Sequence, residues 1–403
     1  MNIFGGEGTS GDGNQIGGKV IGEGGFGCVL KPGITCTGKQ MKSDKFITKI
    51  QVQNSTAERE IKIGKTVKQI SLYKKRFAPI ISTCDYNSKI VSMISHKEDC
   101  RIVSKKPNKK FILSKLPYIK GYHFKKYVSH HVDETLLHTL IHSYTYLLFS
   151  IFLLNKQGII HCDLKGENVM YDSSRKIPVI IDFGLSLIKE DIMPAFDDPK
   201  YEDRLDDYFY IYAPDYYLWC LDIHYVSFLV QHPERDVKTE IPYMVDDYIK
   251  YNKIFQKMTP SFVKRFRSLS IKQLNKYEKM GRNDAIEYII KYCDTWDTYS
   301  LSIMFLRFLK LIEPAENNSE FLKMFDMLLS INMHPDPTER FSSIETYNYM
   351  LNYLKNNSQD KTQYKSIIAS IHKNASDIKK TLKKQIKHDS SLSHKISILK
   401  NNK

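Results

Sequence analysis

A glycine-rich stretch near the N-terminus has the spacing of a phosphate-binding loop. It reads Gly22-Glu23-Gly24-Gly25-Phe26-Gly27-Cys28-Val29, the pattern G-x-G-x-x-G-x-V. Glycines at a hairpin tip let backbone N–H groups approach phosphate oxygens without interference from a Cβ atom. Similar patterns open dinucleotide-binding units, and some glycine-rich hairpins are merely structural. A dinucleotide-binding unit continues into a helix, whereas this sequence continues as a strand, which favours a hairpin that covers phosphates.

A second group of polar residues follows the longest apolar run. The stretch HCDLKGEN places Asp163, Lys165 and Asn168 at the spacing D-x-K-x-x-N, and the triplet Asp182-Phe183-Gly184 follows. A lone aspartate in a loop is usually just solvated. The joint spacing argues against that interpretation here.

Eight motifs, in order along the chain, resemble the signature set of eukaryotic-type protein kinases. The resemblance covers about residues 17–355 and implies a Ser/Thr protein kinase that uses ATP and Mg²⁺. The Lys/Asn/Ile/Tyr-rich composition and the divergent helical part resemble the kinases of large DNA viruses. The motifs are the glycine loop, FITK ending at Lys49, EREI with Glu60, HCDLKGEN, DFG, APD at 213–215, DTYSLSIMF from Asp297, and HPDPTERFS.

The resemblance assigns ATP binding to the glycine loop and to two charged residues. Lys49 would hold the α- and β-phosphates, and Glu60 would fix that lysine as an ion pair. Taken singly, each could be an ordinary surface residue. Glu58 is the fallback for Glu60 because the interval from Lys49 is shorter than in most family members.

The resemblance assigns catalysis and metal binding to the loop and the DFG triplet. Asp163 would orient the substrate hydroxyl and accept its proton, and Lys165 would neutralise the γ-phosphate. Lysine at position 165 is typical of Ser/Thr rather than Tyr kinases. Asn168 and Asp182 would hold Mg²⁺ through oxygen ligands.

Further residues resemble the internal supports of the kinase large lobe. Asp297, which opens a helix, resembles the aspartate that anchors the catalytic loop, and Asp222 is its rival for that role. Asp215 and Arg340 resemble the buried acid–arginine pair, with Asp in place of the usual Glu.

Cys162 stands where the family usually has an arginine that binds a phosphate on the activation segment. The segment from Leu187 to Tyr212 contains no Ser or Thr, and its eight acids and three bases give a net charge of −5. We therefore expect no Ser/Thr phosphorylation there. The acids would either hold the segment in place or attract a basic protein substrate, and an acidic solvated loop is the plain alternative. The Cys162 thiol is expected to be buried and inert.

Three departures from the family leave rival functions open. Gly64 stands where a bulky residue is expected, the Thr-containing stretch before APD is missing, and residues 223–292 form an extra helical insertion. One rival is a pseudokinase-type scaffold that binds ATP without turnover. The other is a small-molecule kinase of the aminoglycoside type.

The elements that would hold these residues indicate an α+β, bilobed, kinase-like fold. Two β-branched runs from residue 17 predict a hairpin, and KFITKIQV and KFILSKLPYI predict further strands. STAEREIKIGKTVKQI predicts a helix with Ser55 as N-cap. We expect a β-rich N-lobe at about 17–118 and a helical C-lobe at about 119–355, with helices at 133–156, 244–256, 260–292, 297–312, 319–331 and 341–355.

Composition sets the remaining expectations. A chain of 403 residues, 42% of them hydrophobic, can bury a large core. The seven cysteines form no CxxC pair, so we expect no zinc site, no disulfide framework and a reducing compartment. The N-terminus has no signal-peptide pattern, so the predicted location is the cytoplasm, or the host cytoplasm or virion if the source is a virus, and not outside the cell.

The two ends and one apolar run complete the analysis. Residues 1–16 are expected to be flexible. The run 140–154 is too short for a membrane span and predicts a buried helix. From Asn356 onward, 11 Lys and 3 Asp give +8 of the total +15. This basic tail, 356–403, has isoleucines at helical spacing that could lie on nucleic acid or an anionic surface, although a solvated tail is the plainer reading.

Overall fold

The chain forms a mixture of antiparallel sheets and helices, in agreement with the predicted α+β class. The computed structural model describes residues 18–24, 27–86, 100, 103, 109–313, 319–357 and 362–401. The predicted flexible segment 1–16 lies outside these residues. The chain divides into two compact units. Unit 1 contains the chain up to Lys120 with Ile181–Gly184 and Lys387–Lys403, and unit 2 contains Gly121–Ile180 and Leu185–Ile386.

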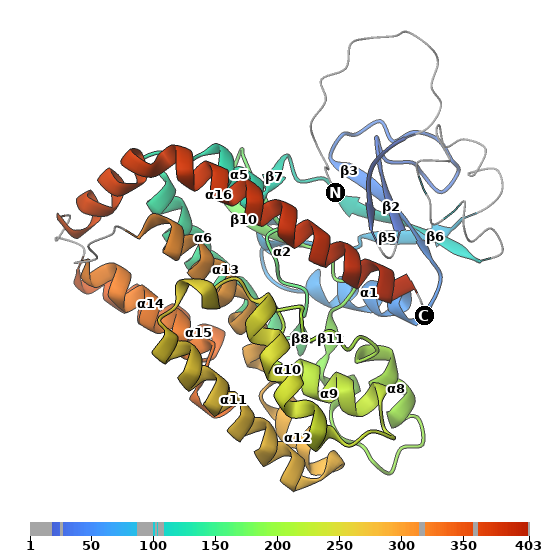
Figure 1. Cartoon of the computed structure of the whole chain (residues 1–403). Coiled ribbons are helices and arrows are strands. Elements are labelled where there is room, and N and C mark those ends of the chain that lie inside the picture. Colours follow the sequence, from blue (N-terminus) through green and yellow to red (C-terminus); the bar gives the residue numbers. More distant parts are fainter. Residues whose placement is uncertain are drawn as a thin grey trace. The chain divides into compact units, whose positions relative to one another are not determined.

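Unit 1 is built on a five-stranded antiparallel sheet whose strands follow the order β1-β2-β3-β6-β5 (Figure 1). Alternate residues of the strands point to one face, and Cys28, Leu30, Ile50, Phe111 and Leu113 form its buried cluster. The elements are β1 (Lys19–Gly24), β2 (Gly27–Lys31), β3 (Phe46–Val52), α1 (Ser55–Val67), α2 (Tyr73–Arg76), β4 (Phe77–Ala78), β5 (Ser82–Asp85) and β6 (Phe111–Pro117).

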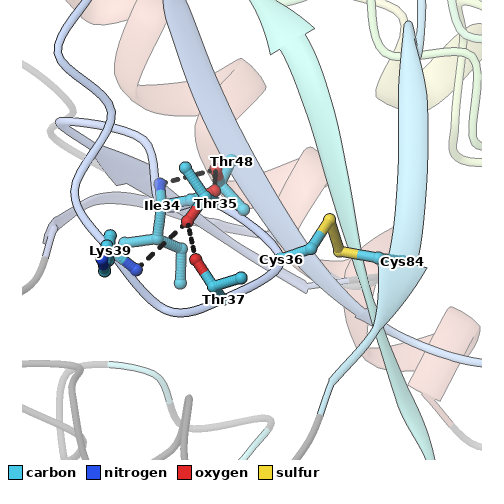
Figure 2. Close-up of a disulfide and its surroundings, with 7 residues drawn as sticks. All are labelled: Ile34, Thr35, Cys36, Thr37, Lys39, Thr48 and Cys84. Atoms are coloured by element: carbon cyan, nitrogen blue, oxygen red, sulfur yellow. Dashed lines mark hydrogen bonds between the residues drawn. A yellow bond between two sulfur atoms is a disulfide. The ribbon is translucent and has the colours of Figure 1, made fainter.

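Two disulfides in unit 1 each join a strand to a segment outside the strands, and the prediction of no disulfide framework is therefore wrong. Cys28 on β2 is bonded to Cys100 with a Cα–Cα distance of 5.8 Å, and Cys36 is bonded to Cys84 on β5 at 5.9 Å. Figure 2 shows the second bridge beside the turn in which Thr35 accepts a bond from Lys39 N–H. The partners lie 72 and 48 residues apart, so only the folded sheet reveals the pairing. The argument for a reducing compartment no longer holds.

Unit 2 is mainly helical. Strands β7, β9 and β10 form an antiparallel ladder, and β8 pairs with β11. Its elements are β7 (Gly121–His123), α5 (Phe124–His130), α6 (Leu136–Asn155), β8 (Ile159–Ile160), β9 (Val169–Asp172), β10 (Ile177–Ile181), β11 (Leu187–Ile188), α7 (Lys189–Ile192), α8 (Tyr201–Tyr208), α9 (Leu221–Gln231), α10 (Val237–Tyr251), η2 (Phe255–Lys257), α11 (Pro260–Met280), α12 (Arg282–Lys291), η3 (Cys293–Thr295), α13 (Trp296–Ile312), α14 (Glu320–Asn332), η4 (Pro337–Glu339), α15 (Ser343–Asn356) and the part of α16 (Thr362–Asn401) up to Ile386.

The helical insertion differs in detail from the prediction. Helix α10 begins at Val237 because the Asp236 side chain accepts a bond from the Lys238 N–H, a cap that the sequence analysis missed. The single segment expected over 260–292 is two helices, since Gly281 adopts φ +81° between α11 and α12. That conformation suits glycine.

Helix α6 lies in the core of unit 2, where it packs against α13 and α15. It has the length and apolar composition of a membrane span, but 61% of its most apolar window is buried inside the protein. The helix therefore reads as the buried core element that the sequence predicted.

The basic tail is a helix whose apolar side is covered by protein, so the tail is not solvated on that side. In α16, Ile367, Ile371, Ile378 and Leu382 are all buried. Tyr364 contacts Phe321 of α14 at 5.3 Å between ring centroids. These isoleucines are thus not available to a membrane, and contact of the exposed lysines with nucleic acid or an anionic surface stays a prediction.

Candidate active site

Lys49, Glu60 and Asp182 form a charged cluster in unit 1. Strand β3 carries Lys49, and its Nζ lies 2.9 Å from both carboxylate oxygens of Glu60 on α1 and 3.3 Å from Asp182 Oδ1. Burial lowers the pKa of Lys49, but the charges of Glu60 and Asp182 outweigh it and raise that pKa above its ordinary value. The lysine is therefore a permanent cation at neutral pH, and Glu60 rather than Glu58 is its partner.

Helix α1 reaches Lys49 in spite of the short connection from β3. Asn54, not Ser55, caps the helix, because its side chain accepts a bond from the Ala57 N–H at 3.0 Å. Gly64 lies so close to the chain at Ile80 that a Cβ there would be 2.8 Å from the Ile80 carbonyl oxygen. The missing bulky side chain at Gly64 is thus replaced by close contact with the Ile80 backbone.

The glycine loop joins β1 to β2. Gly22, Glu23 and Gly24 lie on β1, and Gly27, Cys28 and Val29 lie on β2, with Gly24 opposite Gly27 and Val29 opposite Lys49. Gly25 and Phe26 lie outside the described residues. A Cβ at Gly27 would be 1.8 Å from the Ile50 carbonyl oxygen, so the loop cannot approach β3 with another residue there. The Cys28–Cys100 bridge fastens β2 directly beside the loop.

Asp163, Lys165 and Asn168 form a second cluster, in unit 2, and all three are buried. Asp163 Oδ2 accepts bonds from Lys165 Nζ at 3.0 Å and from Asn168 Nδ2 at 2.9 Å. Asn168 Nδ2 also donates to the Asp163 backbone carbonyl at 2.9 Å. The spacing D-x-K-x-x-N therefore brings two donors to one oxygen of the carboxylate and orients it.

Asp297 holds the backbone of this loop. It accepts bonds from the N–H groups of His161 at 2.6 Å and of Cys162 at 2.9 Å. Burial raises the pKa of Asp297, and these two donors oppose that shift. Cys162 adopts φ +58°, an uncommon conformation for a residue with a side chain, so two strong bonds to its peptide help to keep the turn. The prediction that Asp297, and not Asp222, anchors this loop is therefore confirmed.

The buried acid–arginine pair is Asp222 with Arg340, and the prediction of Asp215 is wrong. Arg340 Nη1 donates to Asp222 Oδ2 at 2.6 Å, and both side chains are 1% exposed. Tyr277 of the insertion donates to the other oxygen at 2.8 Å. Asp222 reaches Arg340 because it opens helix α9, whereas Asp215 lies in the turn before it.

The sequence analysis missed two aromatic residues that contact the loop. Tyr216 OH donates to Asp163 Oδ1 at 2.9 Å, and Trp219 Nε1 donates to the Cys162 carbonyl at 2.6 Å. The signal in the sequence was weak. Both lie in an aromatic run directly after APD, which reads as core packing.

The Cys162 thiol is buried, and burial together with the charge of Asp297 raises its pKa well above the ordinary value. A thiol held neutral in this way is a poor nucleophile. The expected burial of this cysteine is confirmed, and its inertness stays a prediction.

Several charged residues of the segment 187–212 make contacts within unit 2. Tyr208 donates to Asp191 at 2.7 Å, and Lys189 Nζ lies 2.6 Å from Asp294. The segment begins as β11, paired with β8 next to the loop. Other contacts of the segment are Arg204 with Asp198, Arg282 with Glu202 and Gln231 with Asp206.

Comparison with known proteins adds one partial likeness. No family model matches the chain. A stretch of 73 residues, 18% of the chain, is 40% identical to "Probable serine/threonine-protein kinase fnkB" of Dictyostelium discoideum. The match spans 13% of that protein's length. The chain thus contains a region similar to a Ser/Thr kinase.

Proposed function

We propose that the protein is a Ser/Thr protein kinase that transfers the γ-phosphoryl group of Mg·ATP to protein hydroxyls. The observation that carries the proposal is the contact of Lys49 Nζ with both oxygens of Glu60, in a cluster that includes Asp182. Phosphoryl transfer depends on such an ion pair for positioning and charge neutralisation. The partial likeness to a Ser/Thr kinase supports the same class.

The residues fit a nucleotide and a hard cation. Lys49 offers a permanent positive charge to phosphate oxygens, and Asp182, whose side chain is 41% exposed, offers the carboxylate oxygens that Mg²⁺ prefers. Asn168 offers an amide oxygen of the same kind. When bound, Mg·ATP would supply the phosphoryl group and neutralise its charge. Asp163 would orient the acceptor hydroxyl and take its proton, and Lys165 would lie beside the transferred group.

The activation segment is proposed to need no Ser/Thr phosphorylation. Its start is held by the pairing of β11 with β8 and by the ion pair of Lys189 with Asp294. Asp197 and Asp203 are exposed and would favour basic protein substrates. Treatment with a Ser/Thr phosphatase should leave the activity unchanged, and loss of activity would contradict this part of the proposal.

A transfer assay with γ-³²P-ATP and generic basic and acidic proteins tests the function. Asp163→Ala and Asp182→Ala should each abolish labelling. The wild-type chain should label the basic protein more strongly. ATP binding without any transfer would favour the scaffold alternative, and label on a small metabolite alone would favour a small-molecule kinase.

A further inference from the structure

Tyr216 places a hydroxyl group directly on the carboxylate of Asp163. The tyrosine lies in the turn that follows Ala213-Pro214-Asp215, and its side chain is 2% exposed. Its OH donates to Asp163 Oδ1 at 2.9 Å, the oxygen opposite the one that Lys165 and Asn168 contact. Donors from both sides therefore fix the plane of the carboxylate.

The tyrosine is itself held rigidly. Its ring meets Trp219 edge-on, with 5.1 Å between centroids and an interplanar angle of 79°. Trp219 Nε1 donates to the carbonyl of Cys162, the residue before Asp163. The Tyr216 carbonyl lies 3.3 Å from His224 Nε2 on α9. Residues of one short turn thus donate hydrogen bonds both to the side chain of Asp163 and to the backbone of Cys162.

We propose that Tyr216 is a positioning residue that acts through Asp163. The inference rests on the proposed function, since it concerns the same reaction. A hydroxyl that donates to a carboxylate restricts the rotation of that carboxylate. A base that must meet a substrate hydroxyl at hydrogen-bond distance needs this fixed orientation. The segment YFYIYAPD lacks a Thr or Ser, and Tyr216 supplies a hydroxyl from the other side of APD.

The test is Tyr216→Phe, which removes the hydroxyl and keeps the ring. We expect kcat to fall roughly ten- to hundredfold, the range for one hydrogen bond to a charged group. The KM for ATP should stay within about twofold, because Tyr216 acts on the base and not on the nucleotide.

Tyr144→Phe is the matched control. Tyr144 is also fully buried in unit 2, but its OH contacts Ser302 and Asn332 instead of the loop. It should lower the melting temperature without changing kcat or the KM for ATP. A Tyr216→Phe enzyme with wild-type kcat would overturn the inference and leave the proposed function standing. A wild-type chain that transfers no phosphate would overturn both.

Discussion

Removal of the Cys28–Cys100 disulfide should lower the free energy of unfolding of unit 1 by an amount that depends on the lengths of the closed loops. The two bridges span 72 and 48 residues, and the shorter loop lies within the longer one. With the inner bridge intact, the outer one closes an effective loop equal to the difference, about 24 residues. The chain-entropy model gives about 3.5 kcal/mol for a loop of that length.

Hydrogen exchange of the full chain measures this loss where it should occur. In the double variant Cys28→Ala/Cys100→Ala, amides of β3 and β6 that exchange by opening of unit 1 should exchange roughly 300-fold faster, since each 1.4 kcal/mol is a factor of ten. Cys36→Ala/Cys84→Ala should give a similar change, because chain entropy depends on loop length and not on burial. Cys220→Ala, a free buried cysteine of unit 2, should leave these amides unchanged.

Two results would refute the reasoning. Thiol titration of the unfolded, unreduced chain should find three thiols, those of Cys162, Cys220 and Cys293, and a value of seven would show that the bridges do not form. Exchange within about threefold of wild type in both double variants would show that the bridges constrain the unfolded chain far less than the model requires.

Three further predictions concern packing and pH. Arg340→Met should lower the free energy of unfolding by about 3–5 kcal/mol, because it leaves Asp222 charged and buried without its partner. In urea titrations, the double variant Arg340→Met/Asp222→Leu should be less destabilised than Arg340→Met alone. Gly64→Val should cost about 1–3 kcal/mol of unfolding free energy in urea titrations, since its Cβ would lie 2.8 Å from the Ile80 carbonyl oxygen. Burial lowers the pKa of His224 from its ordinary value of 6.5 to about 4. The stability that depends on a neutral His224 is therefore fully present above pH 6.5, and it is lost as the pH falls toward 4. Between pH 7 and pH 4, the unfolding free energy of the wild type should therefore fall by about 3 kcal/mol relative to that of His224→Gln.

The grouping of the candidate site residues could be predicted because their signals are local. The spacing of Asp163, Lys165 and Asn168 lies within one loop, and a carboxylate with two donors so near in sequence has few other ways to fold. Strands β3 and β6 were also readable, since each is a short run rich in β-branched and other apolar residues. Only the end of β3 and the first turn of α1 separate Lys49 from Glu60 in the sequence, which limits the distance between them in the fold.

The errors concern partners that are distant in sequence. Asp215 and Asp222 both precede Arg340 by more than a hundred residues, and only the start of α9 decides which of them reaches the guanidinium. The prediction about the disulfides was wrong for the same reason, since the bonded cysteines are distant in sequence and share no motif. At the cap of α1 the mistake was local: Asn54 and Ser55 are both good caps, and a shift of one residue is within the normal uncertainty of a helix boundary.

The environment of Cys162 explains why the loop can do without an arginine at that position. Cys162 is 5% exposed, and the peptide groups on its two sides are already held by Asp297 and by Trp219. A guanidinium here would need a buried counter-charge or a phosphate to offset its desolvation, and the activation segment offers no Ser or Thr to carry one. Lys189 at the start of that segment forms an ion pair with Asp294. A small, neutral side chain at position 162 is therefore the choice that costs least in a loop whose geometry is set by other residues.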